Sequence, residues 1–334
     1  MELRYIQSLP VERIINYFES HGFTLKKPTA HKLMEKASSL FENLYKCIRQ
    51  TALSDPYKAA DETYYKILVP EKNSKGKGVR KGYLWVVVGI NTRMIYLLYD
   101  DGSRSERVIL NELGSCKGII QSDGYSPYRK LESDAYPNIT RIPCLQHIKR
   151  KFIDCGEKDP DAKRIVELIN ALYQNEHKHK VGVEGWTVEQ NLMHRKKYAP
   201  DILGEIKDVF DEIEERGDLL PKSELQEAIT YLRNEWNAVV DIFNYGDTYL
   251  DNNMVERMNR YISLSRKNSL FFGSHKGAER GAILYTIALT CRMHKVNLFE
   301  YLTDVINRTA EWQPNTPIEK YRELLPDRWE KAND

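Results

Sequence analysis

The segment between residues 61 and 142 changes from helical to strand-like patterning, and the order of its elements limits the folds available to this chain. Val, Ile, Tyr and Trp dominate three consecutive runs, at Thr63–Val69, Tyr83–Ile90 and Met94–Tyr99. Only Asn91–Arg93 separates the second run from the third, which fits a short hairpin loop. We therefore predict three consecutive antiparallel strands in a meander.

A helix and two shorter strands follow this meander. The pattern predicts the helix over Arg104–Leu113 and the strands over Gly118–Gln121 and Ile139–Ile142. With a further helix between these two strands, the order is strand, strand, strand, helix, strand, helix, strand, which is the element order of a ribonuclease-H-like core. The predicted fold class is therefore α/β, with a ribonuclease-H-like mixed five-stranded sheet flanked by helices.

Helical patterns surround the predicted sheet. Pro10 precedes an apolar-periodic run that stops at Gly22, and a second helix is predicted from Thr29 to Ile48. These N-terminal helices fit a small DNA-binding unit and a dimerisation element equally well. Residues from about 145 to 245 contain no strand-like run, so we predict a large all-helical insertion there.

These patterns predict five segments along the chain. They are an N-terminal helical segment at 1–56, the first part of the core at 57–155, the helical insertion at 156–248, the remainder of the core at 249–310 and a C-terminal tail at 311–334.

Three carboxylates stand where the predicted elements could bring them together. Asp61 begins the first predicted strand, Asp123 follows the fourth, and these strands are neighbours in the predicted sheet. Glu256 lies in an early turn of a helix for which Asp251 is the predicted N-cap. Carboxylates are the hard oxygen ligands that two Mg²⁺ ions need for phosphoryl transfer. Either Asp61 or the adjacent Glu62 could be the ligand. Strand alternation sends their side chains to opposite faces, so only one can point at Asp123, and we choose Asp61.

The same segments resemble the motifs of a known family. The chain is similar to the transposases of the insertion-sequence-66 group, bacterial mobile-element enzymes with a ribonuclease-H-like Asp-Asp-Glu domain. The motifs are Ala60–Thr63, Gly82–Trp85, Gly118–Tyr125, Cys144–His147, Asp251–Asn253 with Glu256–Arg257, and Ser265–Phe271.

The resemblance implies a DNA transposase that cuts a strand and joins it to target DNA. It implies Asp61, Asp123 and Glu256 as the catalytic and metal-binding residues, with Mg²⁺ as the cofactor and Mn²⁺ as a substitute. The implied partners are the terminal repeats of the mobile element and target DNA, bound by a homodimer or a larger assembly.

Other residues near the three carboxylates are predicted to support or extend the site. Asn252 and Asn253 are candidate hydrogen-bonding partners of the site. Cys144 and His147 lack a second ligand pair for zinc, so we predict that they orient or pack the catalytic region. Basic residues beside the site are predicted to contact phosphates, with a solvated helix face as the alternative. They are Lys149, Arg150, Lys151, Arg257, Arg260, Arg266 and Lys267.

Composition narrows the class of protein. No stretch approaches the roughly 18 to 20 uncharged apolar residues of a membrane span, and the N-terminus does not resemble a secretory signal. The five cysteines form no CxxC pair, which argues against a disulfide framework and a four-cysteine zinc site. We predict a location in the bacterial cytoplasm, at the nucleoid when the protein is bound to DNA, and no membrane partner.

Two alternatives stay open. The family commonly begins with a coiled-coil segment and a cysteine-rich zinc-binding module, and neither is visible here. One alternative is therefore a catalytically idle DNA-binding remnant or regulator. The other is a nuclease of the same fold, because the sequence does not separate cutting from joining.

Overall fold

A computed structural model describes residues 1–71, 76, 78–156, 159–179, 185–313 and 315–331. Contacts within the chain divide it into two compact units. Unit 1 comprises Met1–Gly118 and Asn253–Asp334, and unit 2 comprises Ile119–Asn252. The five-segment division stays a prediction.

Five strands form a mixed sheet in the order β3-β2-β1-β4-β5. In unit 1, β1 pairs antiparallel with β2, and β2 pairs antiparallel with β3, which confirms the predicted meander. The strands are β1 (Tyr57–Leu68), β2 (Val79–Gly89), β3 (Ile95–Leu98), β4 (Gly118–Ser122) and β5 (Ile139–Pro143).

Strand β1 begins earlier than the sequence predicts. Its first residue is Tyr57, so Asp61 lies inside the strand and not at its start. Lys58 is aligned with Gly89 of β2, and the buried residues Ala59 and Ala60 continue the pairing. Lys and Ala are depleted in strands, and here pairing with a neighbouring strand overrides that local preference.

Helix α12 (His275–Met293) lies along the free edge of β3 in unit 1. The Thr286 hydroxyl accepts a hydrogen bond from the Leu97 amide (2.9 Å). The Thr290 hydroxyl accepts from the Ile95 amide (3.2 Å) and donates to the Ile95 carbonyl (3.1 Å). An edge strand otherwise leaves such backbone groups unpaired. The two threonines therefore provide hydrogen-bond partners for some of the backbone groups at this edge.

Helices precede β1, as predicted. They are α1 (Glu2–Tyr5), α2 (Val11–Ser20), α3 (Lys27–Leu40) and α4 (Glu42–Ser54). The prediction of one continuous helix across residues 29–48 is wrong, because Phe41 leaves the helical conformation (φ −93°, ψ 8°). At the break Phe41 is only 2% exposed, while Leu40 is 45% exposed. Burial of the aromatic ring therefore helps to stabilise the break.

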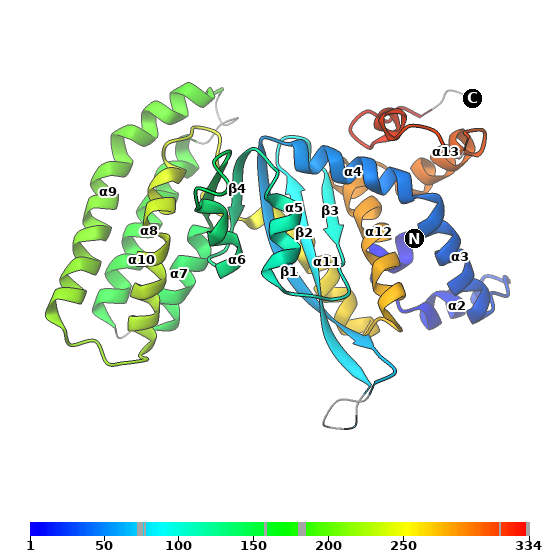
Figure 1. The fold of residues 1–334 in the computed structure, drawn as a ribbon, viewed down its shortest axis with the longest axis horizontal. Coiled ribbons are helices and arrows are strands. Elements are labelled where there is room, and N and C mark those ends of the chain that lie inside the picture. The colour runs from blue at the N-terminus through cyan, green and yellow to red at the C-terminus, as the bar shows by residue number, and fades with distance from the viewer. Residues whose placement is uncertain (72–75, 77, 157–158, 180–184, 314, 332–334) are drawn as a thin grey trace. The chain divides into compact units, whose positions relative to one another are not determined.

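The remaining elements of unit 1 are helical. They are α5 (Glu106–Leu113), α11 (Asn253–Ser269), α13 (Leu298–Ala310) and the 3-10 helix η2 (Ile318–Leu324). Helix α11 packs on β1 and β2, and Figure 1 shows it beyond the strands. Helix α11 begins at Asn253, two positions after Asp251, and Asp251 as its N-cap stays a prediction.

Unit 2 is mostly helical. Its helices are α6 (Ser126–Arg129), the 3-10 helix η1 (Lys130–Glu132), α7 (Leu145–Asp154), α8 (Pro160–His179), α9 (Val188–Arg216) and α10 (Glu224–Ile242). Helix α8 packs on α7 and α9, and α10 packs on α7 (Figure 1). The described residues between 159 and 248 contain no strand, as predicted.

No helix in the described part of the chain is both long enough and apolar enough to span a membrane. All five cysteines are free thiols, and four of them are buried.

Candidate active site

Asp61 and helix α11 are joined by a hydrogen bond inside unit 1. The Asn259 side chain donates from Nδ2 to Asp61 Oδ2 at 2.6 Å. The other carboxylate oxygen, Oδ1, accepts from the Glu62 backbone amide at 2.8 Å. The Asp61 side chain is therefore oriented by a residue that follows it by 198 positions in the sequence.

Glu62 has a different environment. Arg104 donates from Nε to Glu62 Oε1 at 3.0 Å, and the Glu62 side chain is only 4% exposed. The guanidinium of Arg104 therefore compensates the charge of this carboxylate. Glu62 therefore pairs with Arg104, and Asp61 is bonded to Asn259 of helix α11.

One flank of α11 faces β1. Arg266 donates to the Thr63 hydroxyl at 3.3 Å and to the Tyr64 carbonyl, and its guanidinium lies 4.0 Å from the centre of the Tyr64 ring. Residues three and four apart share a helix face. Glu256, Asn259 and Arg266 fit this spacing, so Glu256 lies on the flank that bears the Asp61 contact.

A second flank of α11 faces solvent. This flank includes exposed residues that recur every three or four positions, at Asn253, Arg257, Arg260, Leu264 and Lys267. Three of the cations predicted to bind phosphate are therefore solvent-accessible, whereas Arg266 is turned toward β1.

The start of β4 lies beside the start of β1 in unit 1. Lys58 Nζ donates to the Lys117 carbonyl at 2.8 Å. Gly118 has a φ of +89°, and a Cβ there would come within 2.2 Å of the Pro56 carbonyl oxygen. Only glycine permits this backbone approach and this φ.

Asp123 lies in unit 2, directly after β4. Its Oδ1 accepts from the Tyr125 amide at 3.1 Å, which is a local Asx-type turn. Its backbone carbonyl accepts from Arg141 Nη2 at 3.0 Å. The Gly124 amide donates to the Tyr231 hydroxyl at 2.7 Å, so helix α10 of the insertion also holds this turn.

Arg141 connects this turn to two carboxylates within unit 2. Its side chain is fully buried and forms ion pairs with Glu235 of α10 and, at 2.6 Å, with Glu132. Burial raises the pKa of Glu235, and Arg141 opposes that shift. Burial also raises the pKa of Tyr231, which stays a neutral hydroxyl. The insertion therefore supplies a buried polar network beneath Asp123.

Cys144 and His147 lie at the beginning of α7 in unit 2. Cys144 Sγ accepts from the Asn252 amide at 3.3 Å, and the Leu145 amide donates to the Leu250 carbonyl at 2.9 Å. These bonds fix the segment that directly precedes α11. Cys144 is 1% exposed. Its predicted role in orienting or packing the catalytic region stays a prediction.

The remaining predicted cations follow in α7. Arg150 and Lys151 are exposed, and Lys149 is half-buried with its ammonium 5.9 Å from the centre of the Tyr173 ring.

The predicted site residues are divided between the two units. Unit 1 contains Asp61, Asn253 and Glu256, and unit 2 contains Asp123, Cys144, His147 and Asn252.

Comparison with known proteins identifies the family. The model of the family described as "Transposase IS66 family" matches residues 1–280. The chain belongs to the IS66 family of transposases. This family membership confirms the resemblance found from the sequence motifs.

Curated relatives come from Sinorhizobium fredii (strain NBRC 101917 / NGR234). The chain is 26% identical over 340 residues to "Uncharacterized protein y4jD", covering 98% of this chain and 64% of that protein. It is 24% identical over 347 residues to "Uncharacterized protein y4hP", covering 97% and 60%. The chain therefore spans less than two thirds of the length of these relatives.

Sequence reasoning missed Asn259, Tyr231 and Arg141. Asn259 follows Glu256 by three positions, so helical spacing alone could have placed it on the same flank. Neither Tyr231 nor Arg141 has a comparable local signal, because their partners at residues 122–124 lie far away in sequence.

Proposed function

We propose that this protein is a DNA transposase that cuts a strand at the end of a mobile element and joins the freed 3′ end to target DNA. The proposed metal-binding residues are Asp61, Asp123 and Glu256. The observation that carries the proposal is the Asn259–Asp61 hydrogen bond, since it originates from the flank of α11 that also bears Glu256, in a chain of the IS66 family.

The sheet order supports a ribonuclease-H-like arrangement of these residues. In that arrangement β1 carries Asp61 and the neighbouring strand β4 leads to Asp123. The contact of Gly118 with Pro56 aligns the beginnings of the two strands. A helix that packs on β1 supplies the third carboxylate.

The residues available in unit 1 fit a hard divalent cation. Asp61 and Glu256 offer carboxylate oxygens, and Asn259 offers an amide oxygen, Oδ1, which is buried without a hydrogen-bond partner among the described residues. Buried polar atoms are normally satisfied, and Mg²⁺ prefers oxygen ligands. When bound, two such ions would activate the attacking oxygen and stabilise the leaving one. Mn²⁺ is the expected substitute.

The exposed flank of α11 is the proposed phosphate-binding surface. Arg257, Arg260 and Lys267 project from the side of the helix that faces solvent, and Glu256 lies on the adjacent flank. Cations on a rigid helix can position a DNA backbone without reading its sequence. Lys149, Arg150 and Lys151 of α7 are further proposed phosphate contacts. Binding of two element ends favours a dimer or a larger assembly on DNA.

A cleavage and joining assay tests this proposal. Purified protein is incubated with Mg²⁺ and labelled DNA that carries the ends of the element, together with a target plasmid, and products are resolved on gels. Joined products support the transposase. Cleavage without joining identifies the nuclease, and binding without cleavage identifies the regulator.

Replacing Asn259 with alanine is expected to lower the cleavage rate about 10- to 100-fold and to raise the Mg²⁺ concentration needed for half-maximal activity. The substitution removes the donor that orients Asp61. Titrating Mg²⁺ in a single-turnover assay measures both effects. Ser263→Ala, on the same flank of α11, is the matched control and should behave as wild type. An Asn259→Ala protein with wild-type rates at every Mg²⁺ concentration would rule out this role.

A further inference from the structure

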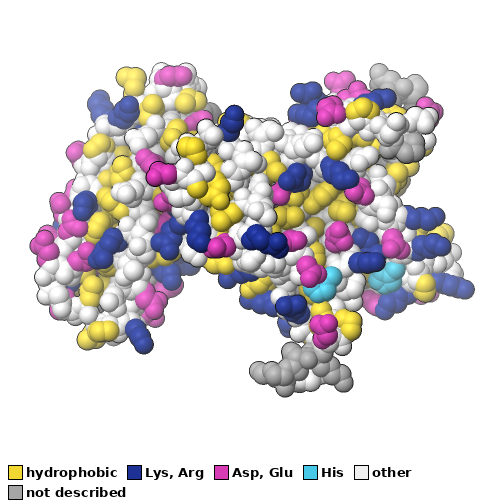
Figure 2. Space-filling model, in the orientation of Figure 1, with side chains coloured by type: hydrophobic (Ala, Val, Ile, Leu, Met, Phe, Trp, Pro, Cys, Tyr) yellow, Lys and Arg dark blue, Asp and Glu magenta, His cyan; other side chains and the backbone are white. Residues whose placement is uncertain are grey.

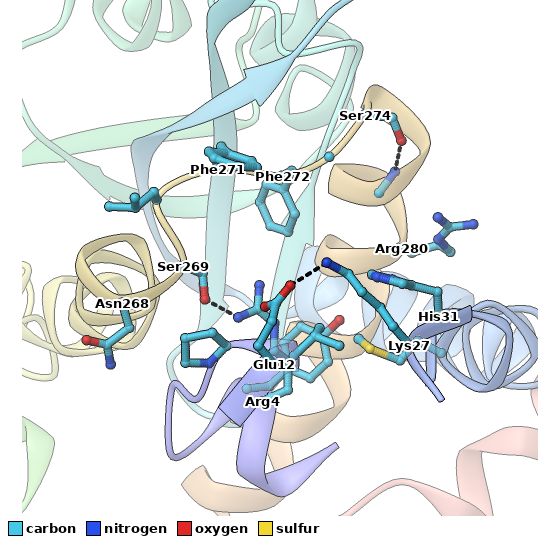
Figure 3. A pocket seen from close by; sticks show the side chains of 17 residues that line it. Arg4, Glu12, Lys27, His31, Asn268, Ser269, Phe271, Phe272, Ser274 and Arg280 are labelled. Atoms are coloured by element: carbon cyan, nitrogen blue, oxygen red, sulfur yellow. Dashed lines mark hydrogen bonds and ion pairs between the residues drawn. The ribbon is translucent and has the colours of Figure 1, made fainter. Parts of the chain in front are cut away.

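A pocket in unit 1 contains cationic and aromatic groups that the proposed active site does not use. Its volume is about 480 Å³, within the range of roughly 300 to 1,000 Å³ that is usual for sites that bind small molecules. Helices α1, α2 and α3 form part of its wall, and the segment after α11 forms another part (Figure 3). Figure 2 shows Lys and Arg side chains gathered around α2 and α3 on the visible face of unit 1.

The charge of the pocket lining is positive. Arg4, Lys27 and Arg280 line it together with a single carboxylate, that of Glu12. Glu12 pairs with Lys27 across the pocket, as Figure 3 shows. Arg280 also pairs with Glu35, which lies outside the lining, at 3.0 Å. Arg4 is therefore the lining cation that no carboxylate of the described residues compensates, and its net positive charge attracts an anion.

Arg4 is the cation best placed to bind that anion. Its guanidinium is half-buried and donates to the Leu9 carbonyl at 3.1 Å and to the Ser269 hydroxyl, which are both neutral acceptors. None of the ion pairs between described residues includes Arg4. A guanidinium fixed by neutral groups keeps its full charge for a phosphate ligand.

Phe271 supplies an aromatic surface at the same pocket. Its side chain is 42% exposed, whereas its neighbour Phe272 is 7% exposed and packs on Tyr65 with ring centres 4.3 Å apart. The Phe272 amide donates to the Lys66 carbonyl at 2.8 Å, and the Phe272 carbonyl accepts from the Leu68 amide at 2.8 Å. Phe271 is thus held in an exposed position by an anchored backbone.

We propose that this pocket binds one unpaired nucleotide of a DNA strand, with its phosphate at Arg4 and Lys27 and its base stacked on Phe271. Cationic grooves with aromatic side chains are the usual means of binding single-stranded nucleic acid. The inference deepens the proposed function and rests on it for the identity of the ligand as DNA.

Helix α11 connects the pocket to the proposed active site. Glu256 lies near its start and Ser269 at its end, and at about 1.5 Å per residue these residues are about 20 Å apart. Duplex DNA rises about 3.4 Å per base pair, so this distance corresponds to about six base pairs. The pocket is therefore placed to hold a strand that has separated from the duplex about six base pairs from the cleavage point.

The test compares two fluorescent DNA probes and measures their binding by anisotropy in EDTA. One probe is a blunt duplex, and the other is a fork of the same duplex with unpaired arms. Wild-type protein should prefer the fork. Phe271→Ala should weaken fork binding about tenfold and leave blunt-duplex binding within about twofold, while Phe271→Trp should keep the preference. Lys27→Gln and Arg4→Gln should each weaken fork binding. Each should also reduce the slope of the logarithm of the binding constant against the logarithm of the salt concentration, by the amount expected for about one phosphate contact.

Matched controls in unit 1 separate this effect from a general loss of binding. Phe299 is 74% exposed and does not line the pocket, and Lys32 lies on α3 outside it. Phe299→Ala and Lys32→Gln should bind both probes as wild type does. The proposal is overturned if wild type does not prefer the fork, or if Phe271→Ala retains the preference or weakens both probes equally.

The outcome is independent of strand cleavage, because EDTA removes the divalent ions that cleavage requires. A protein that prefers forks but never cuts DNA would refute the proposed function and leave the pocket assignment standing. A protein that cuts and joins DNA without preferring forks would support the proposed function and refute the pocket assignment.

Discussion

Replacing Glu256 with glutamine is expected to lower the rate of Mg²⁺-dependent strand cleavage by about a thousandfold or more. The amide keeps the shape of the side chain and removes the negative charge proposed to bind the metal. Glu256 lies in the first turn of α11, the helix that packs on β1. The measurement is single-turnover cleavage of labelled DNA, together with the melting temperature of the protein.

The matched control is Glu279→Gln, which neutralises an exposed glutamate of α12 in the same unit. Both variants should melt within a few degrees of wild type, and only Glu256→Gln should lose cleavage. If Glu256→Gln cuts DNA at the wild-type rate, Glu256 is not a metal ligand and the assignment fails.

Replacing Arg195 with methionine is expected to destabilise the folded protein by about 3 to 5 kcal/mol. The side chain of Arg195 is fully buried and pairs with Glu176 at 2.7 Å. It also donates to the Thr248 carbonyl at 2.6 Å and to its hydroxyl at 2.7 Å. Methionine removes the cation and leaves the Glu176 carboxylate, which is also a hydrogen-bond acceptor for Tyr198, without its charged partner.

Denaturant unfolding followed by circular dichroism measures this cost. Unit 2 should unfold at a lower denaturant concentration, with a separate transition if the two units do not unfold together. Arg164→Met is the matched control. Arg164 pairs with Glu212 at 3.3 Å on the surface, with more than half of each side chain exposed, so its loss should cost less than about 1 kcal/mol. Equal costs for both variants would contradict a structural role for the buried pair.

The strands were predictable from the sequence because their apolar runs are local. β2 contains the apolar run from Tyr83 to Val88, β3 consists of Ile, Tyr and Leu residues, and the turn between them is short. The beginning of β1 was not predictable, because Lys58 and Ala59 become strand residues only through pairing with β2. The helix break at Phe41 was missed for a similar reason, since burial of its ring depends on tertiary contacts.

In the candidate site, the proposed carboxylates were predictable from the sequence, but the residues that orient them were not. Asp61, Asp123 and Glu256 stand at recognisable positions along the chain. The groups that orient them do not, because Asn259 contacts Asp61 across 198 residues and Tyr231 contacts Gly124 across 107. Such contacts depend on how helices pack, and a hydrophobic pattern does not specify them.

Helix α10 of the insertion contacts the turn that contains Asp123. Tyr231 and Glu235 are both on α10, and they reach the turn at Asp123 directly or through Arg141. A helix inserted between the second and third carboxylates therefore does more than separate them in sequence. We infer that α10 holds the Asp123 turn in a fixed conformation, which the proposed metal site requires.

If the three carboxylates bind the metal ions directly, a change of one ligand should alter which metal ion supports cleavage. Asp123 is replaced by cysteine, and strand cleavage is measured with Mg²⁺ and then with Mn²⁺. A thiolate is a poor ligand for Mg²⁺ and a better one for Mn²⁺. We expect Asp123→Cys to show no detectable cleavage with Mg²⁺ and partial recovery with Mn²⁺, while Asp123→Ala stays inactive with both ions. Equal activity of Asp123→Cys with the two metals, or full activity of Asp123→Ala, would contradict direct binding of the metal ions by these carboxylates.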